Sequence, residues 1–332
     1  MLATAVFFSH IADKNFFFSS VLDGGAAVFC FFVISGFYIE MVLSEKYTQK
    51  KLGMNFLKRF YLSRFFRLYP IYLFIAISSI ILSITTNYIH LPEKLNPYSL
   101  SDVSNPFFIL LNWIPNIIMF FLNLPSSDSL LIMPAWSLGV EIAFYAIAPF
   151  VLKFESRWLL VLSFVGIFLQ LIPYGHHAPL LFGIHFFILG ALARRYRYVI
   201  ESFFCIFSRP NLIFLFAISV LMVFFAIPHR FNFGTEVSHA YNSLDTFLYP
   251  LLTAFLIPLL HESTKSNKFD QWVGQLSYPF YLVHLLILET FNSLGCSDKI
   301  SLMFIISLGV SVILFQLEAR FIEPWRASFG RS

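Results

Sequence analysis

Two arginines that stand three residues apart, Arg64 and Arg67, lie in the sequence RFFRLYP just before a long apolar run. Helical residues three apart share one face, and two guanidinium groups on one face are suited to binding phosphate oxygens. The same basic stretch would also orient a membrane helix and contact lipid headgroups. These residues are therefore candidates for an anion-binding site, and lipid anchoring is the alternative explanation.

Three more residues that can exchange protons or bind partners lie within or at the end of apolar runs: His10, Glu141 and His284. A carboxylate near the middle of a membrane helix costs about 2.5–3.5 kcal/mol on insertion scales, so Glu141 should face a wet cavity or tie helices together. His284, in LSYPFYLVH, is as often a hydrogen-bonding residue between helices as a catalyst. His10 ends an apolar run of only nine residues.

Two serines are candidate nucleophiles, Ser35 in FFVISGF and Ser137 in WSLGVE. Either one would need a base within hydrogen-bond reach. The pair of small residues Ser35 and Gly36 has a simpler explanation, because small residues in a membrane helix usually allow a neighbouring helix to approach closely.

The metal-ligating residue types form no recognisable motif. The three cysteines, Cys30, Cys205 and Cys296, are far apart and lack CxxC spacing, so neither a disulfide framework nor a zinc site is predicted. The neighbouring His176 and His177 have no companion ligands, and we assign them no metal.

The elements that must position these residues follow from composition. Of the 332 residues, 58% are hydrophobic and only 12% are charged, with a mean hydropathy of +0.76. Globular domains are typically about 45–50% apolar and about 25% charged. Long unalternating apolar runs favour helices over a barrel, so the sequence predicts an all-α, polytopic membrane helix bundle.

About ten membrane helices are expected. The apolar runs lie at 1–10, 25–44, 68–86, 106–123, 134–152, 158–173, 178–193, 211–228, 244–260, 272–294 and 300–318. The first reaches about 15 Å, half of a hydrocarbon core of about 30 Å, and is expected to be a truncated helix. The run 106–123 is interrupted by Asn112, Pro115, Asn116 and Asn123, so we expect it to lie in or on the outer face.

The distribution of basic residues supports this topology. Ten spans with both termini in the cytoplasm leave only Lys14, Lys94, Arg230 and Lys299 of the 22 basic residues outside. A span at 106–123 would reverse every later loop and place far fewer basic residues inside. The excess of four positive charges therefore reflects loop charge rather than affinity for nucleic acid. We expect one domain over residues 1–332, with no soluble extension.

Six motifs in order give the chain a family resemblance. They are FFSH at 7–10, FFVISGF at 31–37, RFFRLYP at 64–70, WSLGVE at 136–141, LGALARR at 189–195 and LSYPFYLVH at 276–284. In order and spacing they resemble acyltransferase family 3, the bacterial multi-pass membrane O-acyltransferases that modify cell-surface glycans. The resemblance extends to FIEPWR near the C-terminus.

This resemblance implies a bacterial inner-membrane enzyme. It implies acyl-CoA, commonly acetyl-CoA, as the donor on the cytoplasmic side, no metal, and a sugar hydroxyl of a polysaccharide, lipopolysaccharide or related glycan or glycolipid as the acceptor. His10 matches the essential histidine of the family, and Arg64 and Arg67 match its paired arginines. Some members carry a C-terminal hydrolase-like domain, which is not expected here.

One departure from the family concerns the first helix. In the family a basic residue precedes the histidine by eleven positions, and here that position would fall before Met1. The first helix is therefore expected to be cut short, either because translation starts further upstream or because the gene is a degraded copy.

Acyl transfer to a hydroxyl requires a base, oxyanion donors and a hold on the CoA phosphates. A neutral imidazole at His10 is suited to the role of base, with Glu141 as an orienting or acceptor-binding carboxylate, and Arg64 and Arg67 are suited to holding phosphate. Direct transfer and an acyl-enzyme both remain open.

Two other function classes compete with this interpretation. In a proton-coupled transporter or flippase, His10, Glu141 and His284 would form a proton relay, and inverted repeats would favour that function. In an inactive, truncated relative, the motifs would survive only as helix packing.

Overall fold

The structure is a computed structural model that describes residues 2–11, 24–86, 95, 106–120, 122, 130–171, 183–204 and 235–329. The regular elements in these residues are all helices, as predicted. Several of them contain a proline, including Pro70 and Pro279. Membrane helices tolerate proline because neighbouring groups satisfy the backbone atoms that it leaves unbonded.

The helices are α1 (Leu2–Ser9), α3 (Gly24–Glu45), α4 (Gln49–Leu52), η1 (Gly53–Asn55), α5 (Phe56–Thr86), α6 (Pro106–Ile118), η4 (Met133–Ala135), α7 (Trp136–Val151), α8 (Ser156–Leu171), α9 (Ile184–Arg195), α10 (Arg197–Phe204), α12 (Thr235–Thr264), α13 (Lys268–Ser293), α14 (Ile300–Phe321) and α15 (Glu323–Ser328).

Four helical segments in the described residues are long and apolar enough to cross a membrane: Gly24–Glu45, Gln49–Thr85, Met133–Val151 and Ile300–Phe321. They correspond to four of the expected spans. The spans expected at 158–173, 178–193, 244–260 and 272–294 fall largely on α8, α9, α12 and α13, which do not combine that length and hydropathy in the described residues. The span expected at 211–228 lies outside the described residues.

The chain divides into two compact units, which we describe separately. The first comprises residues 1–42, 150–171 and 183–274, and the second comprises residues 43–149, 172–182 and 275–332. His10 and Ser35 belong to the first unit. The arginines, Glu141, Ser137 and His284 belong to the second.

In the first unit, α3 and α9 run parallel along a row of aromatic rings. The rings of Phe29 and Phe186 stack with their centroids 4.7 Å apart, and those of Phe32 and Phe187 stack at 4.5 Å. Because the residue numbers rise together along both helices, the two helices point in the same direction.

Two glycines allow the backbones of α3 and α9 to touch. A Cβ atom at Gly36 would lie 1.9 Å from the carbonyl oxygen of Phe187, and one at Gly190 would lie 1.9 Å from that of Val33. No side chain fits at either position. The prediction that the small residue Gly36 admits a neighbouring helix is thereby confirmed.

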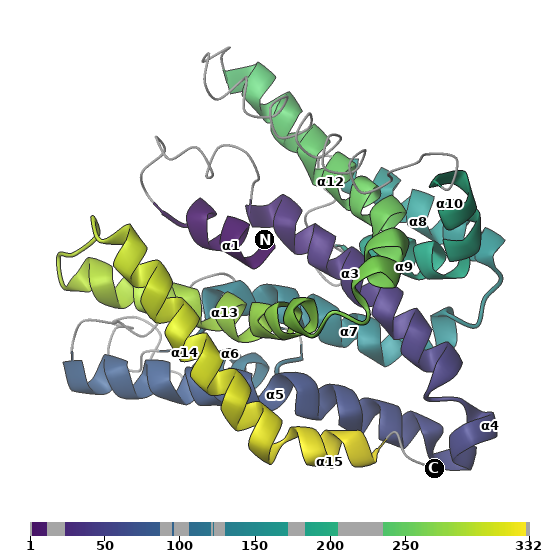
Figure 1. Cartoon of the computed structure of the whole chain (residues 1–332). Helices are drawn as coiled ribbons and strands as arrows, with labels where there is room; N and C mark the ends of the chain where they lie inside the picture. The colour runs from purple at the N-terminus through teal and green to yellow at the C-terminus, as the bar shows by residue number, and fades with distance from the viewer. Residues whose placement is uncertain are drawn as a thin grey trace. The chain divides into compact units, whose positions relative to one another are not determined.

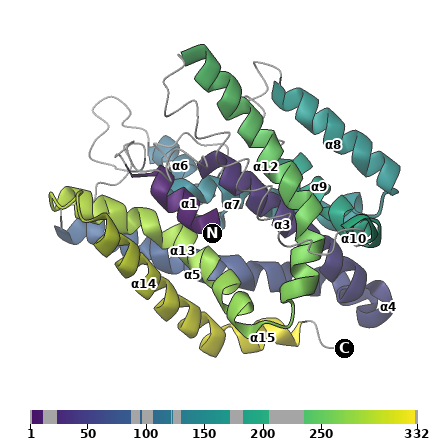
Figure 2. The same ribbon diagram turned by 45° about the horizontal axis from the view of Figure 1, so that its top comes forward.

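The remaining helices of the first unit pack around this pair. Figure 2 shows α12 passing beside α9 and α10, and α8 packs against α9. The short α1 contributes Leu2 to a cluster with Ala26 and Cys30 of α3 and with Leu248 and Tyr249 of α12.

In the second unit, α5 and α13 run parallel. The Tyr278 hydroxyl of α13 donates to the carbonyl oxygen of Leu68, 2.6 Å away. Further along both helices, Ser79 and Glu289 line the same small cavity. The two helices therefore remain side by side from Leu68 to Ser79 and point in the same direction.

Helix α7 runs antiparallel to both. Near the start of α5, the Tyr61 hydroxyl donates to the carbonyl oxygen of Ala146, 2.9 Å away and close to the end of α7. Near the end of α5, Ser79 lines a cavity together with Met133, which lies just before α7. We call α5, α7 and α13 the three-helix core of the second unit.

The doubtful segment 106–123 forms α6 over its first 13 residues. At 1.5 Å per residue this is about 20 Å, shorter than a hydrocarbon core of about 30 Å. Its terminal carbonyl groups receive side-chain donors from α5: Tyr72 bonds the carbonyl oxygen of Asn116 and Tyr69 that of Ile117, both at 2.8 Å. The Asn116 side chain accepts from the Leu131 N–H at 2.8 Å, so this asparagine has the partner that the sequence required.

Helices α14 and α15 pack on α5 in the second unit, as Figure 1 shows. The rings of Phe66 on α5 and Phe329 just after α15 stack with centroids 5.7 Å apart. This packing brings the end of α14, which carries Glu318, to the basic part of α5.

Candidate functional site

The basic stretch belongs to α5 itself, which begins at Phe56, twelve residues before the expected span. Arg64 and Arg67 therefore share a helical face, as their spacing predicted. Arg64 is 9% exposed, and its guanidinium carbon lies 5.9 Å from the ring centroid of Phe60 and 6.0 Å from that of Tyr145. These rings shield the charge from solvent and stabilise it through cation–π interactions.

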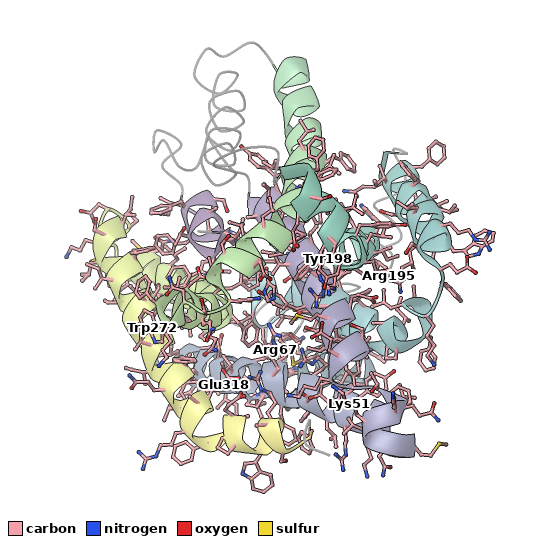
Figure 3. All side chains as sticks on the ribbon, turned by 45° about the vertical axis from the view of Figure 1, so that its right-hand side comes forward. Lys51, Arg67, Arg195, Tyr198, Trp272 and Glu318 are labelled. Carbon is pink, nitrogen blue, oxygen red and sulfur yellow. The ribbon has the colours of Figure 1, made fainter. Side chains whose placement is uncertain are left out.

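Arg67 connects three helices electrostatically. The carboxylates of Glu141 on α7 and Glu318 on α14 lie close enough to attract its charge, and the side chains of Tyr145 and Tyr278 lie in the same neighbourhood. Figure 3 labels Arg67 and Glu318 in the region where α5 and α14 meet. The structure thus brings Arg67 and Glu141 together, two of the residues that the sequence singled out.

Glu141 is half-buried on α7 and accepts a hydrogen bond from the Tyr145 hydroxyl, one helical turn later. This i, i+4 contact orients the carboxylate along α7. Tyr278, whose hydroxyl bonds Leu68, lies on the neighbouring helix α13. We call Arg64, Arg67, Glu141, Tyr145 and Tyr278 the arginine–tyrosine site.

The arginine–tyrosine site is chemically suited to an anion. Arg64 and Arg67 repel each other, and removing two like charges from water is costly unless each is paired. Glu141 and Glu318 offset part of this charge, but Nε of Arg64 is buried and has no hydrogen-bond partner in the described part of the chain. A phosphate group would supply both the missing charge and the missing acceptor.

Ser137 lies at the start of α7 and takes part in a local hydrogen-bond triangle. Its hydroxyl lies 2.9 Å from the Tyr281 hydroxyl and 3.0 Å from the carbonyl oxygen of Pro134, which Tyr281 also contacts at 2.9 Å. These contacts fasten α7 to α13. None of the three is a contact with a general base.

His284 is fully buried on α13. Its Nδ1 lies 3.2 Å from the carbonyl oxygen of Phe280, one turn earlier in the same helix, and its ring packs against those of Phe280 and Tyr281. These contacts fit a packing role, and a catalytic role of His284 remains a prediction.

His10 and Ser35 lie in the first unit. His10 directly follows α1, is exposed, and donates its backbone N–H to the carbonyl oxygen of Phe7 at 3.3 Å. Ser35 is half-buried on α3 next to the contact of Gly36 with α9. Their proposed roles remain predictions.

Sequence reasoning missed a second charged pair in the first unit. Nε of Arg195 lies 2.7 Å from Oε1 of Glu40, and the same guanidinium donates to the carbonyl oxygens of Leu152 and Phe154. Arg195 therefore fastens α3 and α9 to the segment after α7. A carboxylate inside an apolar run indicates that it needs a partner, and Glu40 could have been found in this way. The same holds for Glu318.

No group of three His, Cys, Asp or Glu side chains that could hold a metal occurs within the described ranges. Cys30 and Cys296 form no disulfide within the described part of the chain. Cys205, His176 and His177 lie outside the described residues.

The fold and the site define a helical membrane protein in which two arginines of one helix lie close to carboxylate and tyrosine side chains. Residues 1–316 match the family model described as the acyltransferase domain of acyltransferase family 3, and the chain belongs to this family. The resemblance noted in the motifs is thereby confirmed.

Individual relatives carry a more specific name. The O-acetyltransferase OatA of Staphylococcus aureus strain NCTC 8325 / PS 47 is 25% identical over an alignment 334 residues long. The alignment covers 91% of this chain and 52% of the relative. The OatA proteins of strains COL and MRSA252 match with the same values. The chain thus spans about half the length of the curated relatives it matches. No solved structure matches it.

Proposed function

We propose that the chain is a membrane O-acyltransferase that transfers an acetyl group from acyl-CoA to a hydroxyl of a cell-surface polysaccharide, lipopolysaccharide or related glycan. It lies in the bacterial inner membrane with both termini in the cytoplasm. Membership of the acyltransferase family supports the reaction class, and the O-acetyltransferase name of its relatives supports the acyl group.

The observation that carries the donor assignment is the arginine–tyrosine site. On one face of α5, Arg64 presents a buried positive charge and Arg67 a half-buried one, and at least one donor, Nε of Arg64, is unused in the described structure. Phosphate groups of CoA match this charge and hydrogen-bonding capacity. Membrane lipids also supply phosphate, so the test must separate the two sources.

The proposed chemistry is a balanced transfer. The acceptor hydroxyl loses its proton to His10, its oxygen bonds to the acyl carbon, the carbon–sulfur bond breaks, and CoA leaves as the thiol after taking up a proton. His10 is the proposed base because an imidazole exchanges protons near neutral pH. Glu141 is proposed to orient reacting groups, and Ser35, Ser137 and His284 remain secondary candidates.

Donor binding is tested with acetyl-CoA and the purified full chain in nanodiscs made of a neutral lipid. Arg64→Ala and Arg67→Ala should each weaken acetyl-CoA binding by about tenfold or more, because each removes a charge-assisted contact. The lysine variants should recover only part of the binding, since they lose the planar fork. Lys58→Ala is the matched control, because Lys58 is an exposed cation on the same helix.

This experiment distinguishes arginines that bind acetyl-CoA from arginines that bind lipid headgroups. Equal acetyl-CoA affinity in the wild type and both alanine variants would assign the arginines to lipid anchoring.

The base is tested by transfer of labelled acetyl groups to surface glycan in membranes. His10→Ala should lower the rate by about 10²–10⁴-fold and leave acetyl-CoA binding intact. Ser9→Ala, at the neighbouring position, is the control. Full activity of the His10 variant would remove the catalytic assignment.

A further inference from the structure

Tyr47 is a buried aromatic residue in a hydrophilic part of the chain. It follows α3 in the stretch SEKYTQKK, where Lys46 and Lys50 are exposed, whereas Tyr47 itself is 1% exposed. The next residue, Thr48, caps α4 by accepting a hydrogen bond from the Lys51 N–H at 3.3 Å. The connection between α3 and α5 therefore buries one aromatic side chain and leaves its lysines exposed.

The Tyr47 ring packs inside the second unit, beside the arginine–tyrosine site. It meets the Phe60 ring of α5 edge to face, with the two centroids 5.8 Å apart. The guanidinium carbon of Arg64 lies 5.9 Å from the centroid of the same Phe60 ring, and the Tyr47 side chain lies in the neighbourhood of that guanidinium. Tyr47 and Arg64 therefore pack around one aromatic ring.

Packing explains the ring of Tyr47 but not its hydroxyl group. This hydroxyl is buried and has no hydrogen-bond partner within the described ranges, and the same holds there for Nε of Arg64. An unpaired buried polar group is unfavourable, and a phenylalanine would provide the same ring without that cost. Two such atoms on neighbouring side chains indicate that a ligand supplies the missing partner.

The chemistry of the two groups specifies the ligand. The Nε–H of Arg64 can only donate a hydrogen bond, and the Tyr47 hydroxyl can donate as well. A group with at least two acceptor oxygens can receive both hydrogen bonds. The positive charges of Arg64 and Arg67 favour a group that is negatively charged. A phosphate group meets both requirements.

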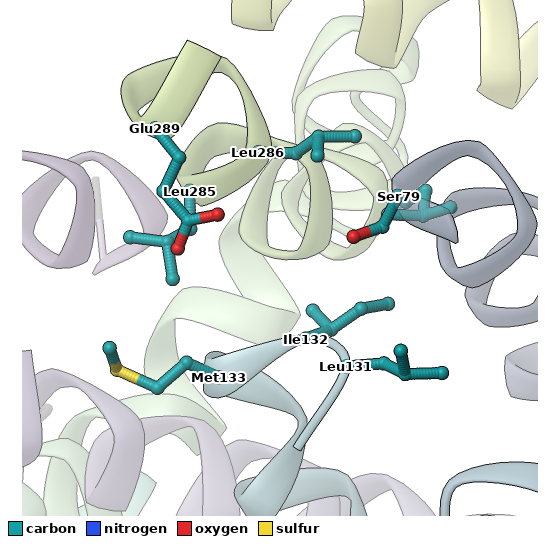
Figure 4. A pocket seen from close by; sticks show the side chains of 8 residues that line it. Ser79, Leu131, Ile132, Met133, Leu285, Leu286 and Glu289 are labelled. Carbon is teal, nitrogen blue, oxygen red and sulfur yellow. The ribbon is translucent and has the colours of Figure 1, made fainter. Parts of the chain in front are cut away.

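The small cavity of the three-helix core does not suit such a group. Figure 4 shows this cavity between Ser79 on α5 and Glu289 on α13. Its volume is about 10 Å³, which is close to the space that one water molecule needs. A phosphate group is larger and would be repelled by the carboxylate of Glu289. The position beside Tyr47 and Arg64 is therefore favoured.

We propose that Tyr47 is a further donor-binding residue, whose hydroxyl donates to the phosphate group of acyl-CoA that Arg64 binds. The inference rests on the proposed function and adds to its donor site a residue outside the arginine–tyrosine site. The exposed lysines on both sides of Tyr47 attract an approaching anion. Tyr47 and Arg64 then bind its phosphate inside the second unit.

Removing only the Tyr47 hydroxyl separates a binding role from a structural one. The purified full chain is measured in dodecyl maltoside, a detergent without phosphate. Tyr47→Phe should weaken acetyl-CoA binding by about tenfold, because a hydrogen bond to a charged group is lost. Without acetyl-CoA, its midpoint of thermal unfolding should equal or exceed that of the wild type, because the variant lacks the unpaired buried hydroxyl.

Tyr61→Phe is the matched control, since it removes a hydroxyl from the residue next to Phe60. The Tyr61 hydroxyl already donates to the carbonyl oxygen of Ala146. This variant should therefore lose stability and keep the acetyl-CoA affinity of the wild type. A Tyr47→Phe variant that behaves in the same way would have only a structural role, and the proposal would be wrong.

A double variant tests whether Tyr47 and Arg64 bind the same phosphate. The loss of affinity in Tyr47→Phe combined with Arg64→Ala should be smaller than the product of the two single losses, because residues that share a partner are coupled. Losses that multiply would show that the two residues act independently, which would overturn the proposal.

Two more outcomes separate this inference from the proposed function. Equal acetyl-CoA affinity in the wild type and Tyr47→Phe would overturn the inference and leave the proposed function standing, whereas a wild type that binds no acetyl-CoA would overturn both. Lipid headgroups also carry phosphate, so dihexanoyl phosphatidylglycerol is measured in parallel. A loss of affinity confined to this lipid would assign Tyr47 to a headgroup and refute its role in donor binding.

Discussion

Replacing Gly36 by alanine should force α3 and α9 apart. The added Cβ would lie 1.9 Å from the carbonyl oxygen of Phe187, whereas ordinary van der Waals contact begins at 3.4 Å. The atom that it meets is backbone and cannot turn away as a flexible side chain could. The helices must therefore separate or tilt, which weakens the stacking of Phe32 on Phe187 and strains the pairing of Glu40 with Arg195.

Two opposing effects determine the size of the change. Overpacking a close-packed core costs about 1–3 kcal/mol. Alanine gains up to about 1 kcal/mol over glycine inside a helix. The expected net loss in the free energy of unfolding is therefore up to about 2 kcal/mol. Gly190→Ala should have a similar effect. The double variant should lose less free energy of unfolding than the two single variants together, because both changes separate the same helix pair.

The assay is the midpoint of unfolding of the purified protein in detergent, with Gly309→Ala on α14 as the control. A Cβ at Gly309 would meet nothing within 4 Å, so this variant should be as stable as the wild type or slightly more stable. If Gly36→Ala is as stable as Gly309→Ala, the close contact of α3 with α9 is wrong.

Two further predictions concern contacts made by single side chains. Arg195→Ala should lower the free energy of unfolding by up to about 3 kcal/mol, because it leaves the largely buried Glu40 without its ion pair, and Arg195→Lys should recover only part of the loss in the same unfolding assay. A lysine variant as stable as the wild type would show that the contacts of the guanidinium with Leu152 and Phe154 contribute little. Tyr72→Phe should cost about 1 kcal/mol and speed hydrogen exchange at the end of α6, since the carbonyl oxygen of Asn116 loses its donor, and unchanged exchange there would contradict the contact.

Local sequence patterns were sufficient for several features of this protein. The apolar runs predict the helices, because a membrane-spanning backbone must satisfy its hydrogen bonds within each segment. The three-residue spacing of Arg64 and Arg67 places them on one face because the helical repeat is a local property. The interrupted segment 106–123 was expected not to span the membrane, and its helix α6 has 13 residues, while its place at the outer face stays a prediction.

Only the tertiary structure decided which distant residues meet. Tyr278 bonds Leu68 from 210 positions away, and Arg195 pairs with Glu40 across 155. These contacts depend on how helices pack, and no periodic pattern within one helix encodes the partner of its polar face. Glu40, Glu141 and Glu318 are carboxylates in apolar surroundings that need partners, although sequence reasoning singled out only Glu141. Helix packing decided that Arg195 pairs with the first and that Arg67 lies near the other two.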